Sequence, residues 1–449
     1  MHSTLPDTGA THIRLRSLTT PLLAFPLLLA GQGIAPAPTW PTGRTVQVFQ
    51  DSAGLVVLQR MASMPITLTL DVASGRVGAL LPESGDTTRL FFVEGGGRVA
   101  SRERMILRGA GDDIRLTILD GSRTRVGTPI PLHEEELTIA NGDVSLAGRF
   151  VRPAAADRYP VVLFLHGSGG ADRGMFVSWG GMLAANGIAS FSYDKRGTGA
   201  STGDWQTSTL RELASDATAI VAALRGRSDV APERVALLGT SQGPWVAAIV
   251  AAADPRIAAV IYSSGGGVSG GEQEIFRRVG LVAASGASAS EVELARNIIT
   301  HYFRYLASGG TDSVGISGYW RDYSATAWFQ HLSMPTKDPT VGTWPKGRTV
   351  FAMDLALDHA GDNHRITVPV LQLLSKADEG IPAERASALL RGQLPHPAEQ
   401  LTSRIFEGSD HRFNIPATEP DDAPRFHPDY FPTIVNWLCT VLHPEAPHR

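Results

Sequence analysis

From about residue 133 onward, short apolar runs alternate with longer segments of helical periodicity, and this alternation constrains the fold more than any other feature of the chain. Short apolar runs bounded by turn residues are typical of strands buried on both faces. Their alternation with helices predicts a parallel sheet covered by helices on both sides. We expect strands at 160–165, 188–193, 234–238, 257–263, 368–374 and 401–406, and helices at 175–186, 210–225, 242–253, 383–390 and 430–442.

The region from about 40 to 130 has a different pattern and predicts a small all-β domain. Its apolar segments are short, alternating or β-branched, and Gly, Asp and Ser separate them. We expect strands at 45–49, 55–58, 66–72, 89–93 and 114–119. At about 90 residues this region is too short for a propeller, whose blades take about 40–45 residues each.

Residues 133 to 151 join the two regions. Asn141-Gly142 lies between two strand-like segments and predicts a hairpin. The preceding run His133-Glu134-Glu135-Glu136 lacks the second histidine of a helical zinc motif, because Leu occupies position 137. We interpret this run as a solvated strand edge.

An insertion from about 265 to 365 interrupts the alternation. Residues 291–305 are apolar at helical spacing, and an aromatic-rich stretch follows them. Because the insertion leaves the sheet at the carboxyl end of a strand, where ligands bind in open α/β sheets, we expect a helical cap over the active site. We expect its aromatic residues to line the substrate pocket, together with one tryptophan after the nucleophile; the alternative is that they form the core of the insertion. The residues concerned are Trp245, Trp320, Tyr323 and Trp328.

Composition and the N-terminus limit the remaining possibilities. The net charge of −4 and the absence of long charged runs give no indication of a nucleic-acid partner. The single cysteine, Cys439, excludes an internal disulfide. Arg14 and Arg16 precede an apolar stretch, so we expect residues 1–37 to be a signal peptide and the protein to be periplasmic or secreted. The alternative is that 1–37 is a disordered N-terminal tail and the protein is cytoplasmic. We therefore divide the chain into 1–37, an N-terminal β domain at 40–130 and a catalytic domain at 133–445.

The pattern Gly-x-Ser-x-Gly occurs three times, at 199–203, 239–243 and 267–271. Only the middle copy lies between a buried strand and an apolar helix, which is the setting of a nucleophile elbow. Pro244 follows it and is compatible with the first turn of a helix. Ser241 is therefore the predicted nucleophile.

A serine nucleophile needs a base and a third group that holds the base, and here these must follow it in the order acid, then histidine. Asp378 lies just past the strand 368–374, with Glu379 as its local rival. His411 follows the strand 401–406. The sequence thus predicts a triad of Ser241, Asp378 and His411.

Hydrogen-bond donors for the tetrahedral oxyanion are also expected. The backbone N–H of Gln242 begins the helix after the elbow and supplies one donor. The glycine-rich loop His166-Gly167-Ser168-Gly169-Gly170 follows the first parallel strand. We assign Ser168 as the second donor, and Gly169 is the next candidate for this role.

Over residues 137 to 443 the chain resembles bacterial α/β-hydrolase esterases related to the prolyl-oligopeptidase and dienelactone-hydrolase groups. The strings that carry this resemblance are the loop 166–170, Tyr193-Asp194-Lys195-Arg196-Gly197-Thr198-Gly199 and Gly239-Thr240-Ser241-Gln242-Gly243. The resemblance implies the α/β-hydrolase fold, and it implies structural roles for Asp194 and Arg196. Pro244 departs from the family, which usually has a second glycine there.

These features predict a serine hydrolase of carboxylesterase type that cleaves small carboxylic esters through an acyl-enzyme. No metal or organic cofactor is implied, and the expected partner is a small-molecule ester. A serine peptidase or amidase acting on small peptides is the alternative within the enzymes. A catalytically silent binding protein on the same fold is the alternative from another class.

Overall fold

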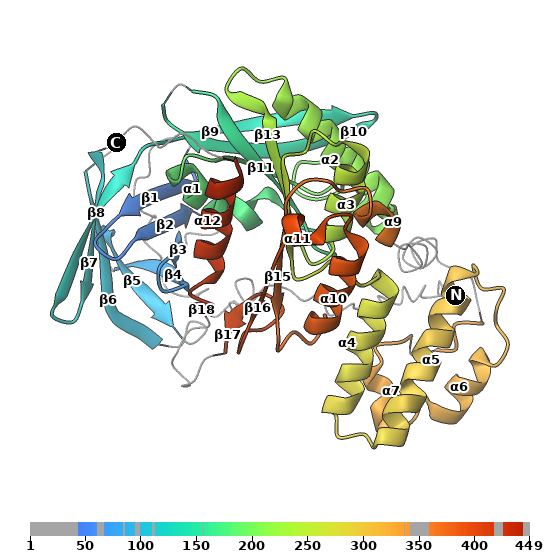
Figure 1. Cartoon of the computed structure of the whole chain (residues 1–449). Helices are drawn as coiled ribbons and strands as arrows, with labels where there is room; N and C mark the ends of the chain where they lie inside the picture. The colour runs from blue at the N-terminus through green and yellow to red at the C-terminus, as the bar shows by residue number, and fades with distance from the viewer. Residues whose placement is uncertain are drawn as a thin grey trace, which may run out of the picture.

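The computed structural model describes residues 44–60, 67–83, 86–94, 99–109, 113–155, 157–335, 337–341, 359–416 and 425–442. The expected signal peptide at 1–37 lies outside these ranges. Figure 1 shows three parts: a blue-to-teal assembly of strands, a central sheet with helices on both faces, and a yellow-to-orange group of helices beside it. None of the helices in the described part of the chain is both long and apolar enough to span a membrane.

The central sheet has eight strands in the order β16-β15-β14-β13-β11-β12-β10-β9. The strands from β11 to β16 pair in parallel, whereas β9 and β10 form an antiparallel hairpin that joins the sheet through β12. The strands are β9 Leu132–Asn141, β10 Val144–Pro153, β11 Tyr159–Leu165, β12 Ala189–Tyr193, β13 Val230–Thr240, β14 Ala259–Ser263, β15 Val370–Ser375 and β16 Leu401–Phe406. The expected mostly parallel sheet is confirmed.

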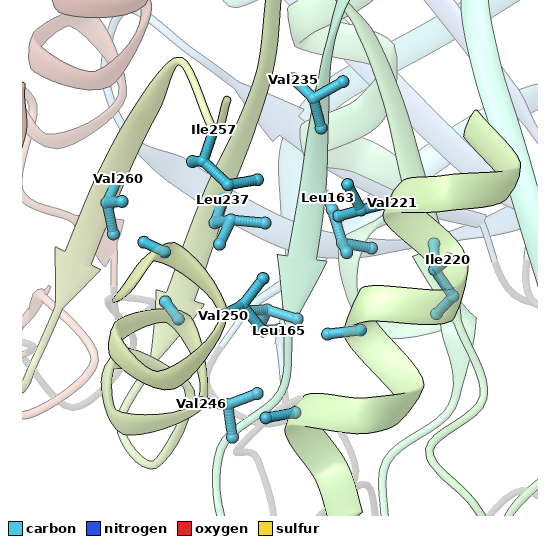
Figure 2. Packing of buried hydrophobic residues seen from close by; sticks show 14 of the residues in the cluster. Leu163, Leu165, Ile220, Val221, Val235, Leu237, Val246, Val250, Ile257 and Val260 are labelled. Atoms are coloured by element: carbon cyan, nitrogen blue, oxygen red, sulfur yellow. The ribbon is translucent and has the colours of Figure 1, made fainter. Parts of the chain in front are cut away.

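Helices cover both faces of this sheet because its inner strands, such as β11, β12, β14 and β15, are buried on both sides. On one face α2 (Leu210–Arg225) and α3 (Gly243–Ala253) pack against residues such as Leu163 and Leu237. Figure 2 shows this packing, with Ile220 of α2 and Val250 of α3 directed toward the strands. On the other face lie α1 (Val177–Ala185) and α12 (Tyr430–Leu442). The other helices described in this part are α9 (Ala360–Asn363), α10 (Ala383–Gln393), α11 (Pro397–Gln400) and the short 3-10 helices η3 (Arg173–Phe176) and η4 (Trp205–Thr207).

The N-terminal part is an antiparallel sheet whose first eight strands close on themselves. Each strand pairs with the next one along the chain, and β1 pairs with β8 to complete the ring. The strands are β1 Val46–Gln50, β2 Leu55–Arg60, β3 Thr67–Asp71, β4 Arg76–Glu83, β5 Asp86–Glu94, β6 Val99–Arg108, β7 Arg115–Asp120 and β8 Arg123–Ile130. Alternate residues point inward, so that Phe49, Leu58 and Leu116 share one apolar core inside the ring.

Part of the outer face of the ring packs against the central part. Val46, Val48 and Val57 belong to the same apolar core as α1 and α12. At Gly181 of α1 the approach is close, since a Cβ there would lie 2.7 Å from the Val46 side chain. Helix α1 is therefore enclosed between the ring and the central sheet.

Two further contacts join these parts. Glu134 at the sheet edge accepts hydrogen bonds from the backbone N–H groups of Thr45 and Val46, so it is a buried link and not the solvated residue that we expected. After His411 the chain forms a small hairpin of β17 (Asn414–Ile415) and β18 (Arg425–Phe426). β18 pairs with β4, and so the hairpin extends the N-terminal sheet.

In the part that the structure describes, the insertion after β14 contains four helices with a core of their own. They are α4 (Gly270–Ala284), α5 (Ala289–Ala307), α6 (Ile316–Tyr323) and α7 (Ala327–His331). Figure 1 shows α4 beside α10, while α5, α6 and α7 lie on the side of α4 away from the central sheet. Whether the insertion closes over Ser241 stays a prediction.

Candidate active site

Ser241 lies at the turn between β13 and α3, in a backbone conformation that L-residues rarely adopt. Its φ is 58°, and such strain is typical of functional sites. The turn is possible because its two glycines allow backbone contacts that a side chain would block. A Cβ on Gly239 would lie 2.3 Å from the Gly243 carbonyl carbon, and one on Gly243 would lie 2.4 Å from the Leu165 oxygen.

The three residues predicted to form the triad come together in one hydrogen-bonded chain. His411 Nε2 lies 3.1 Å from Ser241 Oγ, and His411 Nδ1 lies 2.7 Å from Asp378 Oδ2. The other carboxylate oxygen of Asp378 accepts hydrogen bonds from the backbone N–H groups of Gly380 and Ile381. Asp378 is therefore held as an acceptor, and this arrangement leaves Nε2 of His411 facing the serine.

The rival residues have other surroundings. Glu379 is exposed, whereas Asp378 is buried. The Ser201 hydroxyl donates to the Asp194 carbonyl and accepts from the Ala147 N–H, so it braces a loop. Ser269 caps the N-terminus of α4. Neither of these serines shares the geometry of Ser241.

Backbone strain is concentrated around the triad. Of the four non-glycine residues with positive φ in the described ranges, three are Ser241, Ser264 and Phe413. The Ser264 hydroxyl donates to the backbone oxygen of His411. Phe413 is buried, and its ring stacks on Tyr430 at a centroid distance of 4.2 Å. The backbone around His411 is thus held from both sides, and sequence patterns gave no signal of these contacts.

The loop after β11 approaches the nucleophile at Gly167. A Cβ on that residue would lie 3.2 Å from the Cβ of Ser241. Ser168 is exposed, and Gly169 adopts a φ of 91°. Gln242 stands at the start of α3, beside Ser241. The assignment of Gln242, Ser168 and Gly169 as oxyanion donors stays a prediction; Gly167 is the loop residue that the structure places against Ser241.

A buried lysine connects the two sides of this predicted oxyanion site. Lys195 is 3% exposed, and its ammonium donates to the Gly167 carbonyl at 3.0 Å and to Gln242 Oε1 at 2.9 Å. The neighbouring His166 is also buried, and burial lowers its pKa to about 3, with the Lys195 charge adding to the effect. His166 is consequently neutral at pH 7. Sequence reasoning gave Lys195 no role of its own.

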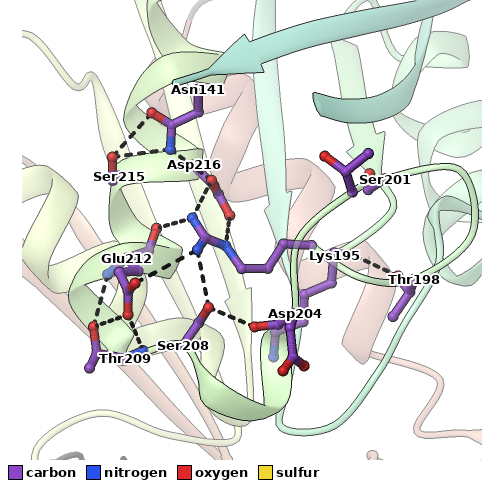
Figure 3. Close-up of polar contacts among 12 residues, drawn as sticks. Asn141, Lys195, Thr198, Ser201, Asp204, Ser208, Thr209, Glu212, Ser215 and Asp216 are labelled. Atoms are coloured by element: carbon purple, nitrogen blue, oxygen red, sulfur yellow. Dashed lines mark hydrogen bonds and ion pairs between the residues drawn. The ribbon is translucent and has the colours of Figure 1, made fainter. Parts of the chain in front are cut away.

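Asp194 and Arg196, which flank Lys195 in the sequence, anchor the segment that carries this lysine. The Asp194 carboxylate accepts from the N–H groups of Arg173 and Ala200. Arg196 forms an ion pair with the buried Asp216 of α2, and this contact raises the Arg196 pKa. Figure 3 shows Asp216, Ser208 and Glu212 around this network. Their contacts are structural, as the resemblance implies.

The aromatic residues that we expected in the substrate pocket are engaged elsewhere. Trp320 and Trp328 are buried in the core of the insertion, and Tyr323 packs against Trp328. Trp245 is 8% exposed, and its indole N–H donates to the Val268 carbonyl. These side chains therefore fill apolar cores, as in the alternative interpretation. The physical reason is that large aromatic surfaces gain most from full burial.

Comparison with known proteins places the chain in a family. Residues 157–413 match the family model described as serine aminopeptidase, S33, which covers more than half of the sequence. The chain belongs to this family. It is thus a hydrolase with the α/β-hydrolase fold and an additional N-terminal antiparallel sheet.

Individual relatives of this hydrolase are distant. The quorum-quenching protein AidA of Acinetobacter baumannii is 29% identical over 133 residues, which is 29% of this chain and 44% of that protein. Among solved structures, proline iminopeptidase of Mycobacterium smegmatis is 18% identical with a TM-score of 0.44, covering 69% of this chain and 99% of that chain. Est1E of Butyrivibrio proteoclasticus, with ferulic acid bound, is 17% identical with a TM-score of 0.42, covering 67% and 96%.

Proposed function

We propose that this hydrolase cleaves small carboxylic esters through a covalent acyl-enzyme on Ser241. The observation that supports the proposal most directly is the hydrogen-bonded chain from Ser241 through His411 to the buried Asp378. A serine hydroxyl becomes an effective nucleophile when a histidine accepts its proton and a carboxylate stabilises the imidazolium. All three partners lie within the distances that such a transfer needs.

In the proposed reaction His411 Nε2 accepts the proton as Ser241 Oγ attacks the ester carbonyl. The N–H of Gln242 and an amide of the loop 167–169 stabilise the oxyanion. His411 then protonates the departing alcohol, and the acyl group remains on Ser241. Water, deprotonated by His411, releases the acid and restores the serine.

The second candidate is a serine aminopeptidase or amidase, and the description of the matched family favours it. The same triad would cleave an amide, but an amine is a poorer leaving group than an alcohol. A catalytically silent binding protein is the third possibility, and the completed triad geometry argues against it. We propose a periplasmic or secreted location on the basis of the N-terminal sequence alone.

The test compares two serines in the same Gly-x-Ser-x-Gly pattern. We expect Ser241→Ala to lose hydrolysis of p-nitrophenyl esters by a factor of about 10⁴ or more while the protein stays folded. Ser201→Ala is the matched control and should keep hydrolytic activity. Only proteins with an intact Ser241 should react with a serine-directed phosphonate.

The same assay distinguishes the candidates. Faster turnover of esters than of aminoacyl amides supports the proposal, and the reverse order supports the aminopeptidase. If Ser241→Ala keeps wild-type activity, the proposed nucleophile is incorrect. If the wild-type protein neither hydrolyses these substrates nor reacts with the phosphonate, a silent binding protein is favoured.

A further inference from the structure

A groove of about 500 Å³ lies between α4, α5 and the first turn of α10. This volume is within the range of small-molecule sites, about 300–1,000 Å³. Its apolar lining includes Ile275 and Phe276 of α4 and Phe303 of α5. Phe303 is buried, whereas Ile275 and Phe276 are half-buried. The groove therefore presents an apolar surface along two helices.

More arginines than carboxylates border this apolar surface. Arg296, Arg304 and Arg385 line the groove against a single acid, Glu272, so the lining carries a formal charge of +2. Arg385 pairs with Glu272, and Arg296 lies 3.6 Å from an exposed glutamate on its own helix. Within the described ranges no ion pair joins the Arg304 guanidinium to a carboxylate. Arg304 is thus available to bind an anion, for which the planar guanidinium is well suited.

The groove begins close to the predicted triad. A Cβ on Gly380 would lie 3.6 Å from His411 Nδ1, and Pro382, two residues further on, lines the groove. Two residues of extended chain span at most about 7 Å. Ser269 also lines the groove. It lies five residues after Ser264, and the Ser264 hydroxyl donates to the backbone oxygen of His411. A short loop makes α4 and α5 antiparallel, so the second half of α5, with Phe303 and Arg304, lies beside the first turns of α4.

We propose that this groove binds the distal end of the substrate, an apolar chain that ends in a carboxylate or phosphate, with Arg304 as the main partner of the anion. This inference rests on the proposed function, because it assigns the part of the ester that extends away from Ser241. Charge and apolar surface are both needed for such a ligand: the arginines select the anionic end, and Phe276 and Phe303 contact the chain. A substrate ammonium would be repelled here.

The kinetic test uses two esters that differ only at the far end. For the intact protein we expect KM for the p-nitrophenyl monoester of octanedioate to be about tenfold below KM for p-nitrophenyl octanoate. Arg304→Gln should remove this difference by raising KM of the charged ester, with kcat unchanged. Arg321→Gln is the matched control, since Arg321 is an exposed arginine of the insertion outside the groove that pairs with Asp322.

A binding measurement separates this inference from the proposed function. Calorimetric titration of the Ser241→Ala variant with decanoate and with decyl phosphate should show binding that Arg304→Gln abolishes, whereas decanol should not distinguish the two proteins. The anion that binds with the higher affinity identifies the end group of the substrate. Equal KM values for the two esters, or anion binding that is unaffected by Arg304→Gln, would overturn the groove assignment and leave the Ser241 proposal intact. Hydrolysis that persists in Ser241→Ala would overturn the function without affecting the titration.

Discussion

At the scale of single residues, Lys195 is a charged side chain that is buried beside the predicted active site. A buried ammonium is costly unless it is hydrogen-bonded. Its two described acceptors are the Gly167 carbonyl and the Gln242 amide oxygen, which belong to the two segments that flank Ser241. Lys195 therefore acts as a positioning residue that fixes the spacing of these segments.

Replacement of Lys195 should impair the reaction more than substrate binding. We expect Lys195→Met, which keeps most of the length and loses the donor, to lower kcat for ester hydrolysis by about 100-fold, comparable to the loss of one oxyanion donor. KM should change little, and Lys195→Arg should recover part of kcat because it restores a cationic donor. Steady-state kinetics of both variants would measure this split. A loss of kcat equal in the two variants, or a change in KM alone, would contradict the positioning role.

At the scale of elements, the hairpin β17–β18 links the turn of His411 to the N-terminal ring. Asn414 begins this hairpin three residues after His411, and the Phe426 N–H donates to the Gly75 carbonyl at 2.8 Å. A Cβ on Gly75 would lie 2.1 Å from the Phe426 oxygen. The ring thus supports the strand that leads away from the predicted base.

A comparison of two glycines tests this support. Gly75 and Gly121 both lie in turns of the ring and both have positive φ, but a Cβ on Gly121 would meet nothing within 4 Å. Both alanine variants should lose about 1–2 kcal/mol of folding free energy through backbone strain. Gly75→Ala should in addition lower kcat/KM for ester hydrolysis by about tenfold or more, because Phe426 and the His411 turn must move. Equal kinetics in the two folded variants would show that the hairpin does not position His411.

At the scale of the whole molecule, one apolar core belongs to two sheets. Val57 of the ring and Val162 of the central sheet lie in the same buried cluster, together with residues of α1 and α12. The insertion, by contrast, has a core that is separate from both sheets. Shared burial couples the unfolding of the two sheets, since neither can open without exposing the other's apolar surface.

Two valines of the ring test this coupling. Val57→Ala should lower the free energy of unfolding by about 2 kcal/mol, and it should raise hydrogen exchange in β2 and in β13 by similar factors. Val126→Ala makes the same change at a position that is 58% exposed and should have almost no effect. Mass spectrometry of amide exchange in urea would report both strands. Faster exchange in β2 alone would mean that the ring unfolds independently.

The sequence by itself determined the features that depend on local pattern. Strand and helix periodicity located the strands of the central sheet, the helices that cover it and α5 of the insertion, because an element buried on both faces or on one face has a characteristic spacing of apolar residues. It did not locate the other helices of the insertion, the short helices α9 and α11, or the hairpin β17–β18. The elbow at Ser241 and the strand-end loops of Asp378 and His411 were found in the same way, since parallel strands bring their carboxyl ends to one edge.

Only the tertiary structure decided the features that depend on contacts between distant segments. The closure of the ring through β1 and β8, the pairing of β18 with β4 and the bridge from Lys195 have no signal in any short stretch of sequence. The aromatic residues of the insertion illustrate the reason. Composition showed that Trp320 and Trp328 are large and apolar, but whether they face a ligand or one another depends on how the helices pack.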